Sequence, residues 1–281
     1  MLRSVKNLEG FAICATDGTI GHVKDFYFDD KAWVVRYLVV ETGSWLSSRK
    51  VLISPMAIGH PNWTDELLPV SITTEQVKNS PDIDAAKPVS RQHEIQYLGY
   101  YGYPYYWAGN GLWGQCAHPG MMLMGLGEGC SEAAYRDAQA EDDRAEAKRD
   151  EGRHGDPDLR SCNELMKYRV EASDGAMGHV QGLLLDDDSW AIRYFIVDTN
   201  NWWLGRQVLV APRWIQDISW ADMTVSVNLT QQAVKDAPLY DAAVPLNRDQ
   251  EMSLHEHHGR AGYWADDMES ASPRHRAMDS A

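Results

Sequence analysis

Basic residues are scarce in this chain. Its 281 residues include 26 Lys and Arg against 41 Asp and Glu, which gives a net charge of −15. Even the most nearly neutral part, residues 2–107, has ten basic and twelve acidic residues. Nucleic acids and anionic membrane surfaces are bound through clustered Lys and Arg, so both are poor partners for this chain. We therefore predict that the chain binds no nucleic acid.

Cysteine and long apolar runs are also scarce. The four cysteines are Cys14, Cys116, Cys130 and Cys162, and no two have the spacing of a metal knuckle or a redox pair. We expect reduced thiols, a cytoplasmic protein, no metal and no cofactor. The N-terminus lacks the apolar region of a signal peptide, and the longest apolar stretch, 112–126, is interrupted by polar residues and glycines. No integral membrane segment is predicted.

The most informative feature is an internal repeat. Residues 2–107 return as residues 159–264 at a constant offset of 157 and without a gap, and over two-fifths of positions 15–55 are identical in both copies. We call these ranges the first and the second repeat. They predict two domains from an internal duplication. A residue that an ancestral activity required should be present in both.

Each repeat begins with short strands. Alternating and β-branched residues predict strands at 11–15, 20–28, 33–41, 51–53 and 68–72, with turns at Asp17-Gly18 and Asp29-Asp30. One short helix is expected at 73–78 and again at 230–235, each ended by a proline. The segments after the helix are expected to be extended. These features predict a mainly β fold of two small barrels, each with a short helix.

Two segments fall outside the repeats. Residues 108–158 connect them: the first part is rich in Gly and Met, and 131–151 is acidic and rich in Ala, which predicts a solvated or fluctuating helix. Residues 265–281 form a tail that we expect to be disordered. The aromatic tract 97–107 has no accompanying basic groove, so we expect it to pack on a barrel rather than on nucleic acid.

An ordered set of motifs resembles the PRC-barrel family. It comprises Asp17-Gly18, Gly21-His22-Val23, Phe28-Asp29, Trp33, Arg36-Tyr37, Trp45-Leu46 and Arg49, and most of it recurs in the second repeat. The resemblance implies two small PRC-type β-barrels that act as docking or assembly modules, as in the cytoplasmic domain of the photosynthetic reaction-centre H subunit and the C-terminal domain of a ribosome maturation factor. It implies no catalytic residues.

Two residue types shared by the repeats are candidate ligand contacts. His22 and His179 each follow a glycine, and Arg36 and Arg193 each lie within an apolar strand. The histidines are interpreted as structural, hydrogen-bonded across the hairpin, and the arginines as members of ion pairs with Glu41, Asp198 or Asp25. Binding of an anion or small ligand by these four residues is the alternative.

The loops after the third strand are the candidate partner-binding surface. They contain Trp45, Leu46 and Arg49 in the first repeat, and Trp202, Trp203 and Arg206 in the second. Tryptophan and arginine are enriched at the energetic centres of protein interfaces. The alternative is that each tryptophan caps its own barrel.

Two further groups are not assigned to a site. The tract His255-Glu256-His257-His258 has no counterpart in the first repeat, and we interpret it as an adventitious surface cluster. Asp29-Asp30 and Asp186-Asp187-Asp188 are interpreted as turn residues rather than acid–base pairs. No constellation for nucleophilic or metal chemistry recurs, so an enzyme is not predicted.

The sequence favours a non-enzymatic scaffold that contacts a protein partner, with a homo-oligomer left open. One alternative is a small-ligand or ion-binding protein with a site between the barrels. The other is a peripheral component of a photosynthetic, reaction-centre-like membrane complex, which rests on fold likeness alone.

Overall fold

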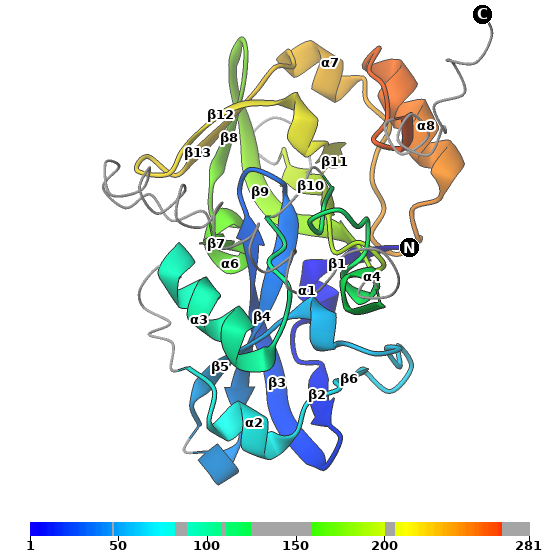
Figure 1. The fold of residues 1–281 in the computed structure, drawn as a ribbon. Helices are drawn as coiled ribbons and strands as arrows, with labels where there is room; N and C mark the ends of the chain where they lie inside the picture. Colours follow the sequence, from blue (N-terminus) through cyan, green and yellow to red (C-terminus); the bar gives the residue numbers. More distant parts are fainter. Residues whose placement is uncertain (47, 82–88, 108–110, 125–158, 200–205, 266–281) are drawn as a thin grey trace, which may run out of the picture. The chain divides into compact units, whose positions relative to one another are not determined.

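The computed structural model describes residues 1–46, 48–81, 89–107, 111–124, 159–199 and 206–265. The predicted helix at 131–151 and the tail after residue 265 lie outside these ranges. The described chain is mainly β, as predicted, and it has two sheets. It divides into two compact units, which are described separately: Met1–Tyr168 with Val180–Phe195, and Arg169–His179 with Ile196–Ala281 (Figure 1).

The sheet of the first unit has the strand order β5-β4-β3-β2-β6, and a sixth strand, β7, pairs with β3. All pairs are antiparallel except β2 with β6. The strands are β2 (Ala12–Ala15), β3 (Gly18–Asp29), β4 (Val34–Thr42), β5 (Lys50–Ile53), β6 (Leu67–Pro69) and β7 (Leu159–Ser161). The predicted strands are therefore confirmed in this repeat, with small shifts at their ends.

Six helical segments of the first unit accompany this sheet. They are α1 (Val5–Leu8), η1 (Ser44–Leu46), η2 (Pro55–Ala57), α2 (Thr74–Lys78), α3 (Arg91–Tyr101) and α4 (Pro119–Met124). A seventh, α6 (Cys162–Leu165), follows β7. The predicted short helix is α2, which begins with a capping box between Thr73 and Gln76.

The other sheet has the strand order β11-β10-β9-β8-β13-β12, and a short N-terminal strand, β1, pairs with β9. Its strands are β1 (Leu2–Ser4), β8 (Arg169–Ala172), β9 (Gly175–Asp186), β10 (Ile192–Asp198), β11 (Gln207–Val210), β12 (Ile215–Ser219) and β13 (Thr224–Val227). Its helical segments are η3 (Pro212–Trp214), α7 (Gln231–Lys235) and α8 (Arg248–His257). Within the described residues, neither strand order closes into a barrel.

Strand β4 is central to the first sheet. Every residue from Val34 to Val40 is buried, including Arg36. Helix α3 packs against this strand, since the ring of Tyr97 meets that of Tyr37 edge to face with centroids 5.1 Å apart. A strand covered on both faces loses the simple alternation of apolar and polar residues, and this explains why 33–41 reads as a nearly continuous apolar run.

Helices α3 and α8 were not predicted. The polar segments that contain them were expected to be extended, but each has a side-chain cap, Ser90 for α3 and Asn247 for α8. Both begin with Arg and have Glu three residues later, a spacing that joins the two side chains across one helical turn. Because few apolar residues fall at helical spacing, the apolar periodicity alone did not indicate a helix.

The N-terminal strands of the repeats are exchanged. Strand β1 of the first repeat pairs with β9, and its counterpart β7 of the second repeat pairs with β3. In the first pairing Leu2 lies opposite Asp186, and in the second Leu159 lies opposite Asp29. The two pairings therefore join equivalent positions of the repeats, which differ by the offset of 157. A three-residue strand has too little pattern to be predicted, and its partner strand could not be inferred from local sequence.

Candidate functional site

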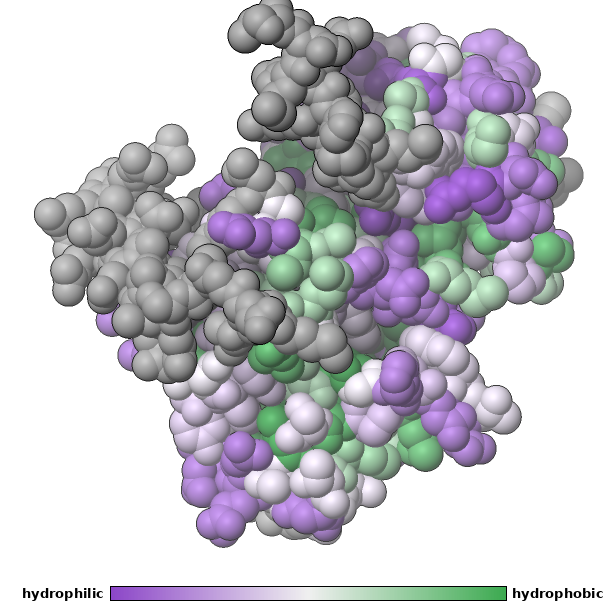
Figure 2. All heavy atoms as spheres, turned by 45° about the vertical axis from the view of Figure 1, so that its right-hand side comes forward, coloured by the Kyte–Doolittle hydropathy of each residue, from purple (hydrophilic) through white to green (hydrophobic). Residues whose placement is uncertain are grey.

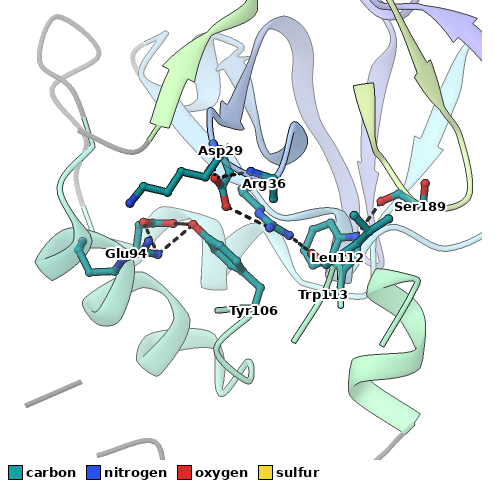
Figure 3. A network of polar contacts seen from close by, with 10 residues as sticks. Asp29, Arg36, Glu94, Tyr106, Leu112, Trp113 and Ser189 are labelled. Carbon is teal, nitrogen blue, oxygen red and sulfur yellow. Dashed lines mark hydrogen bonds and ion pairs between the residues drawn. The ribbon is translucent and has the colours of Figure 1, made fainter. Parts of the chain in front are cut away.

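The most densely connected polar group in the first unit surrounds Arg36, which is only 2% exposed. One guanidinium nitrogen, Nη2, donates to Asp29 Oδ2 over 3.1 Å, and Nη1 donates to the Leu112 carbonyl over 2.6 Å (Figure 3). The guanidinium carbon lies 3.8 Å from the centre of the Tyr106 ring and 4.8 Å from that of Trp113. Aromatic faces stabilise a cation that burial has removed from water. We call these residues, together with Arg91 and Glu94, the Arg36 cluster.

The predicted ion pair of Arg36 is present, but the expected partners were wrong. The partner is Asp29, at the end of β3, and not Glu41, Asp198 or Asp25. Antiparallel pairing places Phe28 opposite Val35 and Asp29 opposite Val34, so the strand register brings this carboxylate beside Arg36. The choice of partner depends on a register shift between Tyr27 and Phe28, which sequence inspection does not show.

Asp29 also forms the turn that follows β3. Its Oδ1 accepts hydrogen bonds from the amides of Lys31 and Ala32, at 3.0 and 3.1 Å. Its other oxygen is the one that meets Arg36. The interpretation of Asp29 as a turn residue is confirmed, and the same carboxylate also pairs with Arg36.

A second part of the cluster joins α3 to the segment after it. Glu94 is 1% exposed. Its carboxylate accepts a 2.6 Å hydrogen bond from the Tyr106 hydroxyl and pairs with Arg91 over 3.0 Å. Burial raises the pKa of Glu94 to about 7, although Arg91 and Tyr106 favour the charged form and oppose the rise. Arg91 also donates to the Tyr106 hydroxyl over 3.0 Å.

The α3 part of the cluster recurs in the second unit. Arg248 pairs with Glu251 over 3.3 Å, and the Tyr263 hydroxyl donates to Glu251 over 2.9 Å. The Arg248 guanidinium carbon lies 4.5 Å from the centre of the Trp264 ring, as that of Arg91 lies 4.1 Å from the centre of the Trp107 ring.

Sequence analysis missed this recurring arrangement. The sequence does contain a signal for it. In both repeats an Arg is followed three residues later by Glu, and a Tyr-Trp pair begins twelve residues after that Glu. The intervening residues differ between the repeats, so these four positions do not stand out as a motif.

One part of the cluster has no repeat equivalent. Trp113 comes from the connector, is fully buried and donates its indole N–H to the Ser189 carbonyl over 2.7 Å. Together with Leu112 it covers Arg36 (Figure 3). Arg193, the counterpart of Arg36, is instead half-buried, with its Nη2 3.4 Å from Ser189 Oγ. Arg36 and Arg193 are equivalent in the repeats, but the connector residues cover Arg36.

The predicted ligand residues do not gather around Arg36. His22 is exposed and lies opposite Glu41 in the β3–β4 pair. Glu41 is five residues from Arg36 along β4, which corresponds to about 16 Å of strand. His179 is likewise exposed and belongs to the second unit. No hydrogen bond across the hairpin is recorded for either histidine among the described contacts.

The Trp loops are described only in part. The backbone of Trp45 lies in η1, and Leu46 is half-buried. Arg49 donates to the Ser80 carbonyl and hydroxyl, each at 3.2 Å, so it ties the loop to the end of α2.

The corresponding loop of the second repeat is described even less fully. Trp202 and Trp203 lie outside the described residues. Arg206 is half-buried, and its carbonyl accepts hydrogen bonds from the amide and the hydroxyl of Thr199.

The interpretation of the histidine tract as a surface cluster was wrong for His255, whereas Glu256 and His257 are exposed. His255 lies on α8, is 3% exposed and packs edge to face against Trp214 and Trp264. Its Nδ1 is 3.0 Å from the Ala261 carbonyl. His258 also packs on Trp214, and burial lowers the pKa of His258 to about 4. The tract lies at the end of α8, and the helix turns His255 inward to the core.

The carboxylates of Asp186, Asp187 and Asp188 are the one group in the described chain that could hold a metal ion. Asp186 accepts hydrogen bonds from the amides of Asp188 and Ser189, as the turn interpretation predicted. Asp187 pairs with Arg3 over 2.7 Å. These contacts agree with the turn interpretation of Asp186 and add an ion pair at Asp187.

A comparison of the sequence with known families identifies a domain type in the first unit. Residues 2–59 match the family model of the PRC-barrel domain. The chain contains a PRC-barrel domain. The predicted family is thereby confirmed, and the matched residues run from β1 to just beyond η2. A search of curated proteins finds no match to this chain.

The PRC-barrel match divides the Arg36 cluster. Asp29 and Arg36 lie inside the matched residues, whereas Arg91, Glu94, Tyr106 and Trp113 lie beyond them. The family domain thus supplies the buried ion pair, and later segments supply the residues that cover it. None of the helices in the described ranges has both the length and the hydropathy needed to cross a bilayer.

Exposed large apolar residues are distributed over both units. In the described chain they are Met1, Tyr100, Met121, Leu123, Met223, Leu239, Val244 and Met252. On the face shown in Figure 2, hydrophobic residues are interspersed with hydrophilic ones. Single exposed apolar residues are normal on protein surfaces and do not by themselves indicate a binding site.

Proposed function

We propose that this chain is a non-enzymatic scaffold in which two PRC-type repeats, produced by an internal duplication, contact a protein partner. The observation that carries the proposal is the PRC-barrel domain at residues 2–59, since this domain points to a protein-interaction module in general. The second repeat would be a second unit of the same type. Cytoplasm is the proposed compartment.

The use of polar residues in the Arg36 cluster supports this proposal. Arg36, Asp29 and Glu94 are buried, and each is engaged with other residues of the chain. A catalytic site would need such groups within reach of a substrate. Their burial favours a structural use, in which the ion pairs fix the position of α3 and of the connector segment around Trp113.

We propose the Trp loops, at 45–49 and 202–206, as the partner-contacting surface. Both repeats have Trp and Arg at these positions, and buried Trp and Arg often dominate the energy of protein interfaces. Arg49 supports the first loop through its contacts with Ser80. A small-ligand site formed by His22, Arg36, His179 and Arg193 gains no support, because Arg36 is buried about 16 Å along the strand from His22.

The test is an affinity pull-down from the native cell with quantified recovery. We expect a Trp45→Ala, Trp202→Ala double variant to lose a partner that the unmodified chain recovers, by at least about tenfold. Trp220→Ala is the matched control, because Trp220 is a half-buried tryptophan outside these loops. Equal recovery by the double variant would dismiss the Trp loops as the contact surface.

A further inference from the structure

The exchanged strands belong to an arrangement with approximate two-fold symmetry. Val34 of the first repeat pairs with Ala191 of the second, and these two residues are equivalent positions of the repeats. When a residue pairs with its own equivalent, it lies at a two-fold axis, as in a self-complementary dimer interface. The pairing of β1 with β9 and of β7 with β3 is then related by the same operation.

Hydrogen bonds on both sides of this axis repeat the relation. The Val35 amide donates to the Trp190 carbonyl over 2.8 Å, and the Ile192 amide donates to the Trp33 carbonyl over 2.7 Å. The two tryptophans are equivalent, and both have a left-handed backbone, with φ of 57° and 59°. This conformation is uncommon for a bulky residue and persists where the surroundings determine it. The same unusual turn on both sides provides the two acceptors.

Ion pairs at the exchanged strands also occur at equivalent positions of the two repeats. Arg3 on β1 donates to Asp187 over 2.7 Å, and Arg160 on β7 donates to Asp30 over 3.1 Å. Arg160 and Asp30 each have 15% of their side chain exposed, so the pair is only partly screened by water. Each repeat therefore offers an arginine on a short strand and an aspartate after its long strand.

We propose that this surface is a homotypic docking surface whose partner is a second PRC-type repeat with the same strand and aspartate, and that it does not require an unbroken chain between the two repeats. Apolar residues at the exchange support this: Leu159 on β7 is buried, as are Val5 and Cys162, which directly follow β1 and β7. Without the partner, the backbone edges that accept β1 and β7 would be open, and open edges favour pairing with another chain. The connector then acts as a tether that raises the local concentration of one repeat around the other.

The test uses the full chain with a protease site inserted between Glu141 and Asp142. The folded protein is cleaved to completion, as judged on a denaturing gel, and then passed over a sizing column at low micromolar concentration and measured by native mass spectrometry. We expect the two fragments to remain together in a 1:1 complex. Separation or aggregation of the fragments after cleavage would overturn the proposal.

Charge reversal tests whether the exchanged strands hold the fragments together. In the cleaved protein, an Arg3→Asp, Arg160→Asp variant should raise the fragment dissociation constant at least about tenfold. Restoring opposite charges with Asp187→Arg and Asp30→Arg should recover much of the affinity, which a merely misfolded variant would not do. Lys6→Asp is the control, because Lys6 is exposed and close to β1 in sequence.

A dissociation constant that the arginine reversal leaves unchanged would contradict the assignment of the docking surface to β1 and β7. This result is separate from the pull-down, because the fragments are tested without an external partner.

Discussion

The buried carboxyl of Glu94 should make the stability of the protein fall as the pH rises. In the unfolded chain this group ionises with a pKa of 4.5, and in the folded protein with a pKa of about 7. Between these values the folded state keeps a proton that the unfolded state has lost, so folding becomes less favourable with increasing pH. Below pH 4.5 both states are protonated, and above pH 7 both are ionised, so the effect is confined to this window.

The size of the effect follows from the two pKa values. Ionising a carboxyl whose pKa rises from 4.5 to about 7 costs the folded state about 3 kcal/mol. Glu94→Gln keeps the shape and an oxygen that can accept the Tyr106 hydrogen bond, but it cannot ionise. We therefore expect the free energy of unfolding of the variant, relative to the unmodified protein, to rise by about 3 kcal/mol between pH 4.5 and 8.

The assay is urea unfolding followed by circular dichroism at several pH values between 4.5 and 8. Glu75→Gln is the control, because Glu75 is an exposed carboxylate on α2 and its substitution removes one negative charge without touching the Arg36 cluster. A relative stability of Glu94→Gln that stays constant across this range would refute the reasoning. A direct titration of the Glu94 carboxyl by NMR would then show whether its pKa in the folded protein is raised.

Further substitutions test other contacts by equilibrium unfolding. Arg36→Met should destabilise the first unit by about 3–5 kcal/mol, since it leaves the Asp29 carboxylate buried without its cation, and adding Asp29→Asn should restore part of the loss. Gly21→Ala would place a Cβ against the backbone carbonyl of Glu41 on β4 and should cost more than about 2 kcal/mol. Gly99→Ala, on α3 with open space around it, should instead stabilise by about 0.5–1 kcal/mol. Trp113→Phe removes the indole hydrogen bond and should cost about 1–3 kcal/mol; an unchanged midpoint would show that the connector segment contributes little.

The local parts of the fold were predictable from sequence. Strands β2 to β5 and helix α2 were expected because alternation, turn residues and a cap-like threonine act over a few neighbouring positions. The buried ion pair of Arg36 was also expected, because a charge in an apolar strand needs a partner. Its identity as Asp29 was not, since that depends on the strand register.

The remaining features depend on contacts between distant residues. The exchange of β1 and β7 cannot be read from a Leu-Arg-Ser tripeptide, although its occurrence in both repeats was visible. Helix α8 was missed because its inward face includes Glu251 and His255, polar residues that apolar periodicity does not count. The covering of Arg36 by Trp113 depends on the connector, which lies outside the repeat and therefore outside the comparison between its copies.

The strand exchange also has a consequence for synthesis on the ribosome. Strand β1 is synthesised long before its partner residues, 184–186, which lie about 180 positions later in the chain. At about 5–20 residues per second, translation takes roughly 10–40 s to reach them. Any nascent chain that stops within the connector has neither β9 for its first strand nor β7 to complete β3. Strand β1 therefore has no partner until about the first quarter of the second repeat, residues 159–186, has been made.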